Sequence, residues 1–259
     1  MKIYIMVSDD VIFKPRVLYR ILQRRVKDIC GVVEVGDRKT KENKKNNQPT
    51  NIQFLGIKGF LILGFYRYFL RTLKFFPLPS FIKSKLSNKN VCSFFKVPYE
   101  YIYNVNDQNF IRRISSLKPD IILSCQRQIF SEDLLKVAKI ACINCHPSKL
   151  PKYRGLSPIL VAMINGEESI GVTVHTMTKQ IDKGAIICQK EFATSKEYSL
   201  MDNLSLAHEL YSDVILESFD LLEKKGISDF PWVPNDAPYY KSPSLEDIKR
   251  LRASGLKIV

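Results

Sequence analysis

Residues 140–155 read IACINCHPSKLPKYRG, an apolar run that passes directly into polar residues. The run from Ile140 to Ile143 predicts a short strand. Asn144 and His146 follow two positions apart, so they project from the same side if the extended geometry continues. This stretch therefore predicts two polar side chains aimed at one point at the end of a strand, where sites gather in open α/β sheets.

Strand and helix patterns alternate on the N-terminal side of this stretch. The expected strands cover residues 2–7, 29–35, 99–105 and 120–125, and the expected helices cover 15–26, 109–117 and 131–139, the last with Ser131 as N-cap. A strand, a helix and a strand in that order are typical of a parallel βαβ unit, with ligands at the carboxyl edge of the sheet. We therefore expect an α/β fold with a Rossmann-like, mostly parallel sheet and flanking helices.

The expected organisation is a catalytic domain in residues 1–200 that carries a basic aromatic insertion at about 37–97, followed by a C-terminal helix and strap in 201–259. Residues 205–222 have helical periodicity, which predicts a helix covering the sheet. Residues 226–244 contain four prolines, so a short irregular extension is expected there.

Composition limits the class of protein. The chain has 259 residues, of which 45% are hydrophobic and 25% charged, which is ordinary for a globular protein and argues against global disorder. The formal net charge is +14, and residues 38–96 hold 13 Lys and Arg against one acid, Glu42. Because the positive charge sits in one segment rather than across a whole face, it indicates an appended feature and disfavours nucleic acid as the partner.

The insertion has two parts. Residues 37–53 are polar and lack periodicity, which predicts a loop. Residues 54–86 are aromatic and basic without acids, and three interpretations stay open: a helix packed on the core, an amphipathic helix lying on an anionic membrane, or a transmembrane span. The span is disfavoured, because Lys58 and Arg67 bracket only eight uncharged residues and a span needs roughly 20.

The cysteines and the first residues bear on the compartment. Six cysteines without a short framework indicate reduced thiols. The N-terminus has five apolar residues in a row before Ser8, too few for a signal-peptide core. We expect a cytoplasmic protein, with the inner face of the membrane as a further possibility if residues 54–86 bind lipid.

An amide, an imidazole and a carboxylate suit acyl transfer to an amine. The tetrahedral intermediate carries negative charge on oxygen, which an Asn amide or a protonated imidazole stabilises. His also suits proton removal from the amine, because its ordinary pKa lies near ~6.5. Asp182, in the run Ile181-Asp-Lys-Gly184, would orient the ring or hold a relay water. Taken singly, each of these residues is more often a turn or structural residue.

Three other classes of protein remain open. Cys142 and Cys145 match the redox motif CxxC. In thioredoxin-like redox sites the pair lies at the start of a helix, whereas Cys142 falls within an expected strand. His146, His175 and Asp182 are candidate metal ligands, but their spacing matches no common metal motif, and we expect no metal. A non-catalytic module that only binds a ligand or docks on a membrane is the third alternative.

The runs NCHPSKLPKYRG at 144–155, GVTVH at 171–175 and IDKG at 181–184 together resemble the folate-dependent formyltransferase family, most of all its sugar N-formyltransferase branch. The resemblance implies transfer of a formyl group from 10-formyltetrahydrofolate, with a non-catalytic folate-binding module as the alternative. It also implies that Asn144, His146 and Asp182 are the catalytic residues.

The same resemblance implies where the cofactor and substrate bind. The folate pocket is expected to use mainly backbone groups of two loops, with these residues: Gln128, Ile129, Phe130, Thr178, Ile181 and Asp182. The substrate is expected near the acids that end the first strand and in the loop after His146, with these residues: Asp9, Asp10, Ser148, Tyr153 and Arg154. Tyr239 and Tyr240 are expected to pack on the core, with stacking on a substrate base as the alternative.

Departures from the family pattern narrow the expected substrate. The first strand ends in Val7-Ser-Asp-Asp10 rather than in a glycine-rich phosphate loop, which argues against glycinamide ribonucleotide. We expect no separate C-terminal β-domain of the kind that methionyl-tRNA formyltransferases carry, because the sequence stops before one. A nucleotide-linked amino sugar for surface polysaccharide synthesis is therefore the expected substrate, with methionyl-tRNA or a lipid-linked sugar as the alternatives. A homodimer stays open.

Overall fold

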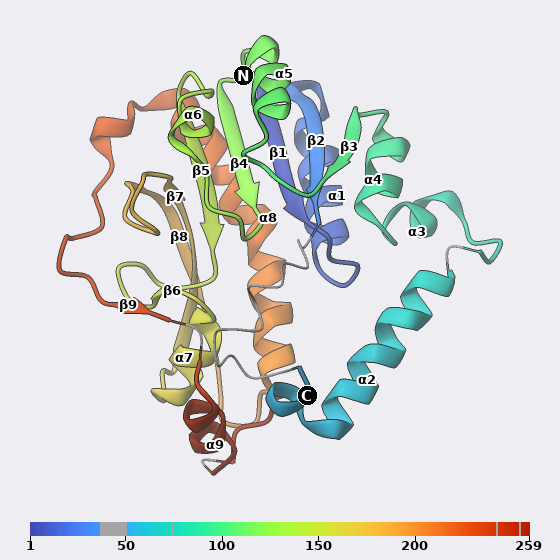
Figure 1. The fold of residues 1–259 in the computed structure, drawn as a ribbon, viewed down its shortest axis with the longest axis vertical. Coiled ribbons are helices and arrows are strands. Elements are labelled where there is room, and N and C mark those ends of the chain that lie inside the picture. Colours follow the sequence, from blue (N-terminus) through green and yellow to red (C-terminus); the bar gives the residue numbers. More distant parts are fainter. Residues whose placement is uncertain (37–50, 74, 242, 254) are drawn as a thin grey trace.

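The computed structural model describes residues 1–36, 51–73, 75–241, 243–253 and 255–259. Within these residues, a seven-stranded sheet has the order β3-β2-β1-β4-β5-β7-β8 (Figure 1). The strands are Ile3–Ser8 (β1), Ile29–Val35 (β2), Tyr99–Ile102 (β3), Ile121–Cys125 (β4), Ala141–His146 (β5), Ser169–Thr176 (β7) and Ile186–Ala193 (β8). The pairs among β1 to β5 are parallel, and β7 and β8 add to the sheet in antiparallel fashion. The prediction of a mostly parallel α/β sheet is confirmed.

Side chains of β1 alternate between two apolar clusters. Ile3, Ile5 and Val7 join one cluster and Tyr4 and Met6 join the other, so each cluster lies on one face of the sheet. Both faces are therefore buried, which explains why the strand reads as a nearly continuous apolar run.

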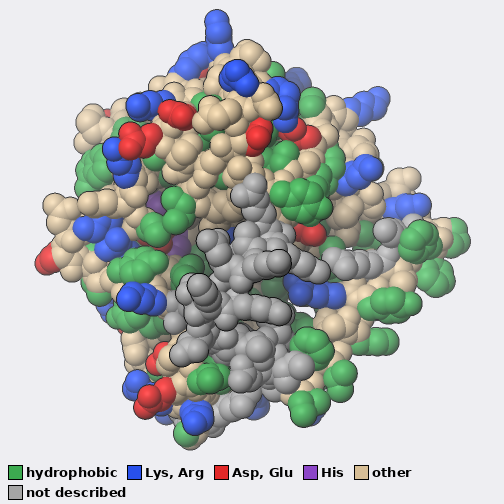
Figure 2. All heavy atoms as spheres, in the orientation of Figure 1, with side chains coloured by type: hydrophobic (Ala, Val, Ile, Leu, Met, Phe, Trp, Pro, Cys, Tyr) green, Lys and Arg blue, Asp and Glu red, His purple; other side chains and the backbone are tan. Residues whose placement is uncertain are grey.

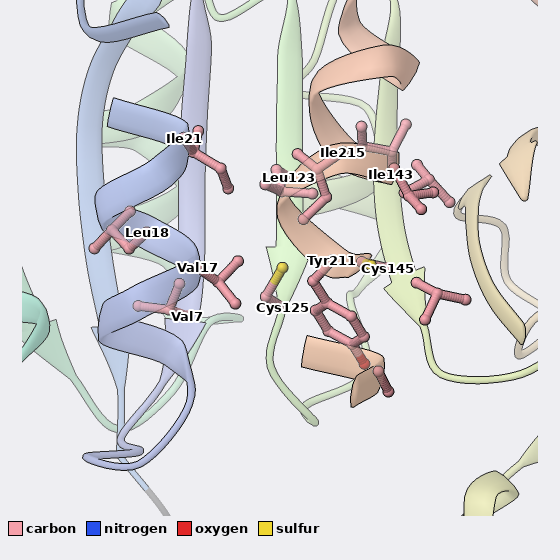
Figure 3. Close-up of a cluster of buried hydrophobic side chains, with 14 of the residues drawn as sticks. Val7, Val17, Leu18, Ile21, Leu123, Cys125, Ile143, Cys145, Tyr211 and Ile215 are labelled. Atoms are coloured by element: carbon pink, nitrogen blue, oxygen red, sulfur yellow. The ribbon is translucent and has the colours of Figure 1, made fainter. Parts of the chain in front are cut away.

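Helices cover both faces. Residues of α1 (Lys14–Arg25), α4 (Asn88–Phe95), α7 (Pro158–Ile164) and α8 (Leu200–Lys224) belong to the first cluster. Residues of α5 (Gln108–Leu117) and α6 (Glu132–Leu135) belong to the second. Figure 3 shows Val17 and Ile21 of α1 and Ile215 of α8 directed toward Leu123 of the central strand β4. The molecule is thus a three-layer sandwich with the sheet in the middle.

Several expected boundaries move by a few residues. The helix expected at 131–139 is only the single turn of α6, although Ser131 does cap it by accepting a hydrogen bond from the Leu134 N–H. Strand β3 stops at Ile102 rather than 105, and β5 runs on to His146 rather than ending at Ile143. Asn144 and His146 therefore lie inside a paired strand, which fixes the direction of their side chains.

The C-terminal part returns to the sheet. Helix α8 begins earlier than the predicted residue 205, because Ser199 and Asp202 form a reciprocal capping box at its start. A strap then leads to β9 (Tyr239–Tyr240), which pairs in parallel with β6 (Arg154–Gly155). Helix α9 (Leu245–Ala253) follows. The strap thereby holds the loop that follows β5.

The insertion places two helices at the side of the body (Figure 1), α2 (Asn51–Leu73) and α3 (Ser80–Ser84). Of the loop predicted at 37–53, residues 37–50 lie outside the described residues, and helix α2 already begins at Asn51. The packed-core interpretation of this segment is wrong for most of α2, since Phe65 and Leu61 are 71% and 62% exposed. Within the described part of the chain, no helix is both long and apolar enough to cross a bilayer.

Candidate functional site

The site begins with the pairing of β5 and β7. Their antiparallel register sets Asn144 opposite His175 and His146 opposite Thr173. The Asn144 Nδ2 atom lies 3.4 Å from the His175 Nε2 atom. Asn144 is half-buried, whereas His146 and His175 are buried. An amide and two imidazoles therefore meet near the carboxyl end of β5.

Asp182 enters this group from the loop after β7. One carboxylate oxygen, Oδ2, lies 3.7 Å from His146 Nδ1, and the other, Oδ1, lies 3.5 Å from His175 Nε2. The backbone N–H of Gly155 donates a hydrogen bond of 2.9 Å to Oδ2. The structure thus brings together the three residues that the resemblance singled out, although they span 39 positions of the chain.

Backbone geometry accounts for the run Asp182-Lys-Gly184. Asp182 has a φ of 51°, in the left-handed region that Asp tolerates better than most residues. Gly184 turns the chain back against β7, where an added Cβ would lie 1.7 Å from the Thr176 carbonyl oxygen. Only glycine fits at this position, so the tight return sets where Asp182 can be.

Backbone carbonyls fix one nitrogen of each imidazole. His146 Nε2 lies 3.0 Å from the Tyr153 carbonyl oxygen, and His175 Nδ1 lies 2.8 Å from the Thr176 carbonyl oxygen. A carbonyl only accepts, so each of these nitrogens carries a proton. The other two nitrogens, His146 Nδ1 and His175 Nε2, both face Asp182.

Burial and charge act in opposite directions on these groups. Burial lowers the pKa of His146 below its ordinary value, and the Asp182 carboxylate opposes this shift. Burial alone would raise the pKa of Asp182, but the hydrogen bond with His175 and the nearby charges of His146 and His175 lower it to about 2. Asp182 is therefore a carboxylate at neutral pH, beside an imidazole that is neutral and ready to accept a proton.

Arg154 holds the loop in place. Its guanidinium is buried and donates to the carbonyl oxygen of Ile181 at 2.8 Å and to that of Ala237 at 2.6 Å. A planar fork with several donors suits two carbonyls at once. Arg154 thus ties the residue before Asp182 to the C-terminal strap, and its donors are engaged within the protein.

Other expected substrate residues are also engaged in internal bonds. The Ser148 hydroxyl donates to the Lys152 carbonyl at 3.0 Å, and the Tyr153 hydroxyl donates to Glu167 at 2.6 Å. Asp10 accepts hydrogen bonds from the backbone at the start of α1, at 2.6 Å from Ile12 N. Asp9 is exposed just beyond β1, two strands away from β5 in the sheet. Substrate contact by these residues stays a prediction.

The first expected folate loop is held by its own side chains. Gln128 accepts from Val105 N at 3.0 Å and donates to the Tyr103 carbonyl at 2.9 Å. Phe130 is buried in the second apolar cluster, whereas Ile129 is 63% exposed. The Gln126 side chain also accepts from the Gln128 N–H and donates to the Gln128 carbonyl oxygen at 2.9 Å. Contact of this loop with folate stays a prediction.

The second expected folate loop borders a hollow. The Thr178 hydroxyl donates to the Gln180 carbonyl at 2.9 Å and so shapes the turn that leads to Ile181. A cavity of about 560 Å³ lies between this loop and the C-terminal strap, a size common for ligand sites. Its lining residues are Thr178, Lys179, Gln180, Lys183, Trp232, Val233, Pro234 and Asn235. Asn144, His146 and Asp182 do not line it, so the hollow adjoins the polar group without containing it.

The CxxC pair has no redox geometry. Cys142 and Cys145 are three positions apart in a strand, so their side chains point to opposite faces of the sheet, and they belong to different apolar clusters. Burial raises the pKa of Cys142 to about 12. Among the described residues, no group of three or more His, Cys, Asp or Glu side chains is arranged to hold a metal ion.

His175 is the member of the site whose role the sequence did not reveal. It reads as an alternating strand residue that packs or bonds nearby. In the structure it contacts both Asn144 and Asp182 and so links them. The available signal was the alternation in this strand. His175 and Thr173 are polar and lie on the same strand face, and Thr173 pairs with His146.

Fold and site together define a class: an open α/β sheet with an amide, imidazoles and a carboxylate at the carboxyl end of a central strand. Residues 78–216 match the formyl transferase family, and the chain belongs to that family. The matched segment includes the whole polar group.

Individual relatives agree with this assignment. The chain is 43% identical over 131 residues to the bifunctional polymyxin resistance protein ArnA of Wigglesworthia glossinidia brevipalpis, covering 50% of this chain and 19% of that protein. It is 34% identical over 134 residues to the methionyl-tRNA formyltransferase of Borrelia garinii subsp. bavariensis, covering 51% and 42%. The chain thus spans less than half the length of these curated relatives.

A solved structure shares the fold. WlaRD, described as a sugar 3N-formyl transferase and solved in the presence of dTDP and 5-N-formyl-THF, superposes with a TM-score of 0.58 at 16% identity, covering 98% of this chain and 79% of that one. At this identity the likeness concerns the fold.

Proposed function

We propose that this chain transfers the formyl group of 10-formyltetrahydrofolate to a primary amine. The observation that carries the proposal is the contact of Asp182 with His146 and His175, and of His175 with Asn144, at the end of β5. Membership of the formyl transferase family supports the same reaction. The cofactor supplies a formyl group attached to nitrogen. The residues of the site act on the oxygen of that formyl group and on the protons of the two nitrogens that exchange it.

Each residue has one proposed task. The Asn144 amide lies beside His175 at the end of β5, and its N–H group donates to the formyl oxygen as negative charge develops there. His146 accepts the amine proton at Nδ1, since Nε2 is held by the Tyr153 carbonyl. Asp182 then stabilises the imidazolium, directly or through a relay water, until the proton passes to the departing nitrogen. A formamide and tetrahydrofolate result.

The proposed acceptor is an amino sugar carried on a nucleoside diphosphate, for surface polysaccharide synthesis. Its support is the shared fold with WlaRD, which was solved with dTDP and a formylated folate. Methionyl-tRNA is the second candidate, because methionyl-tRNA formyltransferases are among the relatives at 34 to 38% identity. The proposed location is the cytoplasm, where both acceptors would be available.

The test uses the full chain with 10-formyltetrahydrofolate and a panel of nucleotide-linked amino sugars, with methionyl-tRNA included. Mass spectrometry is expected to show one amino sugar gaining the mass of one carbonyl group. Asp182→Asn should abolish the gain, whereas Asp229→Asn, a matched change at an exposed position, should not. Formylation of methionyl-tRNA alone would replace the sugar proposal, and no product with any acceptor would remove the enzymatic one.

A further inference from the structure

Helix α2 exposes an apolar stripe at helical spacing. Ile57, Leu61, Phe65 and Tyr68 follow one another at intervals of three or four residues, so they share one face of the helix. They are 73%, 62%, 71% and 67% exposed. On the helix of a globular protein, this is the spacing of the face that is normally buried.

The opposite face of the same helix is less exposed. Gly59 is buried, and Leu63 and Leu70 are half-buried. At 3.6 residues per turn these positions lie across the helix from the stripe. The stripe is therefore the outward face of α2, and it is apolar.

The apolar surface continues beyond α2. Phe76, Phe81 and Ile82, in and before α3, are 57%, 54% and 39% exposed. Figure 2 shows hydrophobic side chains interleaved with Lys and Arg along the side of the molecule where Figure 1 places α2 and α3. We call residues 57–86 the apolar arm. Exposed apolar surface of this extent on one segment marks an interaction site.

The charges of the arm decide what kind of surface it meets. Exposed Lys58, Arg67 and Lys83 lie among the aromatic residues, and the sequence from 57 to 99 contains no Asp or Glu. Two copies of the arm would bring only like charges together, which opposes self-association through this face. An anionic surface, in contrast, is attracted by the basic residues and accepts the apolar ones.

We infer that the apolar arm docks this protein onto an anionic lipid bilayer, with the Ile57 to Tyr68 stripe inserted at the boundary between headgroups and acyl chains. Lys58 and Arg67 lie on either side of the stripe, where they reach headgroup phosphates. A helix that lies in the interface gains from both apolar burial and lipid charge. The eight uncharged residues between the two basic ones are too few to span roughly 30 Å of hydrocarbon.

The arm is attached at the edge of the sheet that carries the site. Asn88, at the start of α4, is buried and donates to the carbonyl oxygen of Ser8, the last residue of β1. The Lys85 ammonium lies 4.5 Å from the centre of the Tyr19 ring on α1. Docking through the arm would therefore hold the carboxyl edge of the sheet, and with it the site, on the membrane side of the molecule.

The experiment measures binding of the full chain to vesicles by co-sedimentation. Vesicles of phosphatidylcholine with about 30 mol% phosphatidylglycerol are expected to bind the protein at low salt, and binding should weaken steeply as ionic strength rises. Pure phosphatidylcholine vesicles should bind far less. Ile57→Ser with Phe65→Ser should weaken binding at least about tenfold, because exposed apolar area is lost.

A matched pair of charge reversals isolates the arm from the net charge. Arg67→Glu with Lys83→Glu should lower the affinity at least about tenfold, since each basic residue near an anionic surface contributes measurably. Lys224→Glu with Lys225→Glu changes the net charge equally at the exposed end of α8, and should retain most of the binding. Equal losses in the two variants would overturn the docking surface.

Three further outcomes would also overturn it. The first is the absence of binding to anionic vesicles at low salt. The second is tighter binding of single-stranded RNA than of vesicles. The third is a dimer that Phe65→Ser dissociates while vesicle binding is unchanged. Formyl transfer to a soluble acceptor should be unaltered in the arm variants, so failure of the docking inference and failure of the proposed function remain distinguishable.

Discussion

The loop around Asp182 buries polar groups, whereas the apolar arm exposes apolar ones. Soluble proteins usually bury apolar side chains and expose polar ones. Around Asp182, two imidazoles are buried and the carboxylate is half-buried, and each has a partner. Along α2, isoleucine, leucine and phenylalanine are exposed next to lysine and arginine. Burying polar groups and exposing apolar ones both work against stability. Such departures therefore point to binding or chemistry, and the proposals give the two regions different tasks.

The largest effect is expected from a substitution of His146 in the polar site. His146→Ala removes the proposed proton acceptor while Asn144 and Asp182 remain, so the rate of the chemical step should fall by about 10² to 10⁴-fold. Affinity for folate should change far less, because folate contacts are expected elsewhere. Single-turnover kinetics and folate titration measure the two quantities. Equal losses in both would assign His146 a structural role.

The same substitution in the two regions should have opposite signs. Gly184→Ala forces a Cβ against the Thr176 carbonyl, so the free energy of unfolding should fall by about 2–3 kcal/mol. Gly64→Ala meets open space in the middle of α2, and should raise the stability of that helix by about 0.5–1 kcal/mol at most. Chemical denaturation of both variants provides the measurement. A lower free energy of unfolding for Gly64→Ala would mean that another part of the protein packs closely against α2 at this position.

Lowering the pH should reduce the free energy of unfolding through protonation of Asp182. Its folded pKa of about 2 lies below its ordinary value of 3.8, so the carboxylate stabilises the fold above about pH 4 and this contribution is lost as the pH falls toward 2. The loss amounts to about 2 kcal/mol. Burial of neutral His146 acts in the same sense, since its stability contribution is present above its ordinary pKa and declines as the pH falls below it.

Asp182→Asn should therefore lose less stability between pH 5 and pH 2 than the parent chain, by about the same 2 kcal/mol. Asp229→Asn is the control and should follow the parent. Urea denaturation at several pH values measures the slope. Parallel curves for Asp182→Asn and the parent would show that the carboxylate is not stabilised in the fold.

The smallest effect is expected in the arm. Phe65→Ser should change the free energy of unfolding by less than about 0.5 kcal/mol, because the side chain is already 71% exposed. A core phenylalanine such as Phe110, 2% exposed, should cost about 3–5 kcal/mol when replaced by Ala. A large loss in Phe65→Ser would indicate that this face is covered in solution.

Much of the fold was predictable from local patterns. Strand β2 begins and ends at the predicted residues 29 and 35, and β1, β4 and α5 lie within one residue of their predicted bounds at each end. Apolar runs and helical spacing encode these elements directly. The end of β5 was not predicted, because a neighbouring strand decides how far pairing continues and β7 pairs with β5 up to His146.

The site was predictable to the extent that it lies in short motifs. Asn144 and His146 follow from a spacing of two along a strand. The contact of His175 with Asp182, and the capture of the Arg154 guanidinium by Ile181 and Ala237, join distant parts of the chain. Periodicity carries no information on such contacts.

The sequence by itself determined the bounds of β1, β2 and β4 to within one residue, the motifs and the basic aromatic character of residues 57–86. Only the tertiary structure decided that Asp182 meets two imidazoles, that Cys142 and Cys145 point to opposite faces, and that the stripe on α2 faces outward. The physical reason is the same in each case. Hydrophobic spacing tells which face of an element is apolar, whereas what lies against that face depends on the packing of segments far apart in the chain.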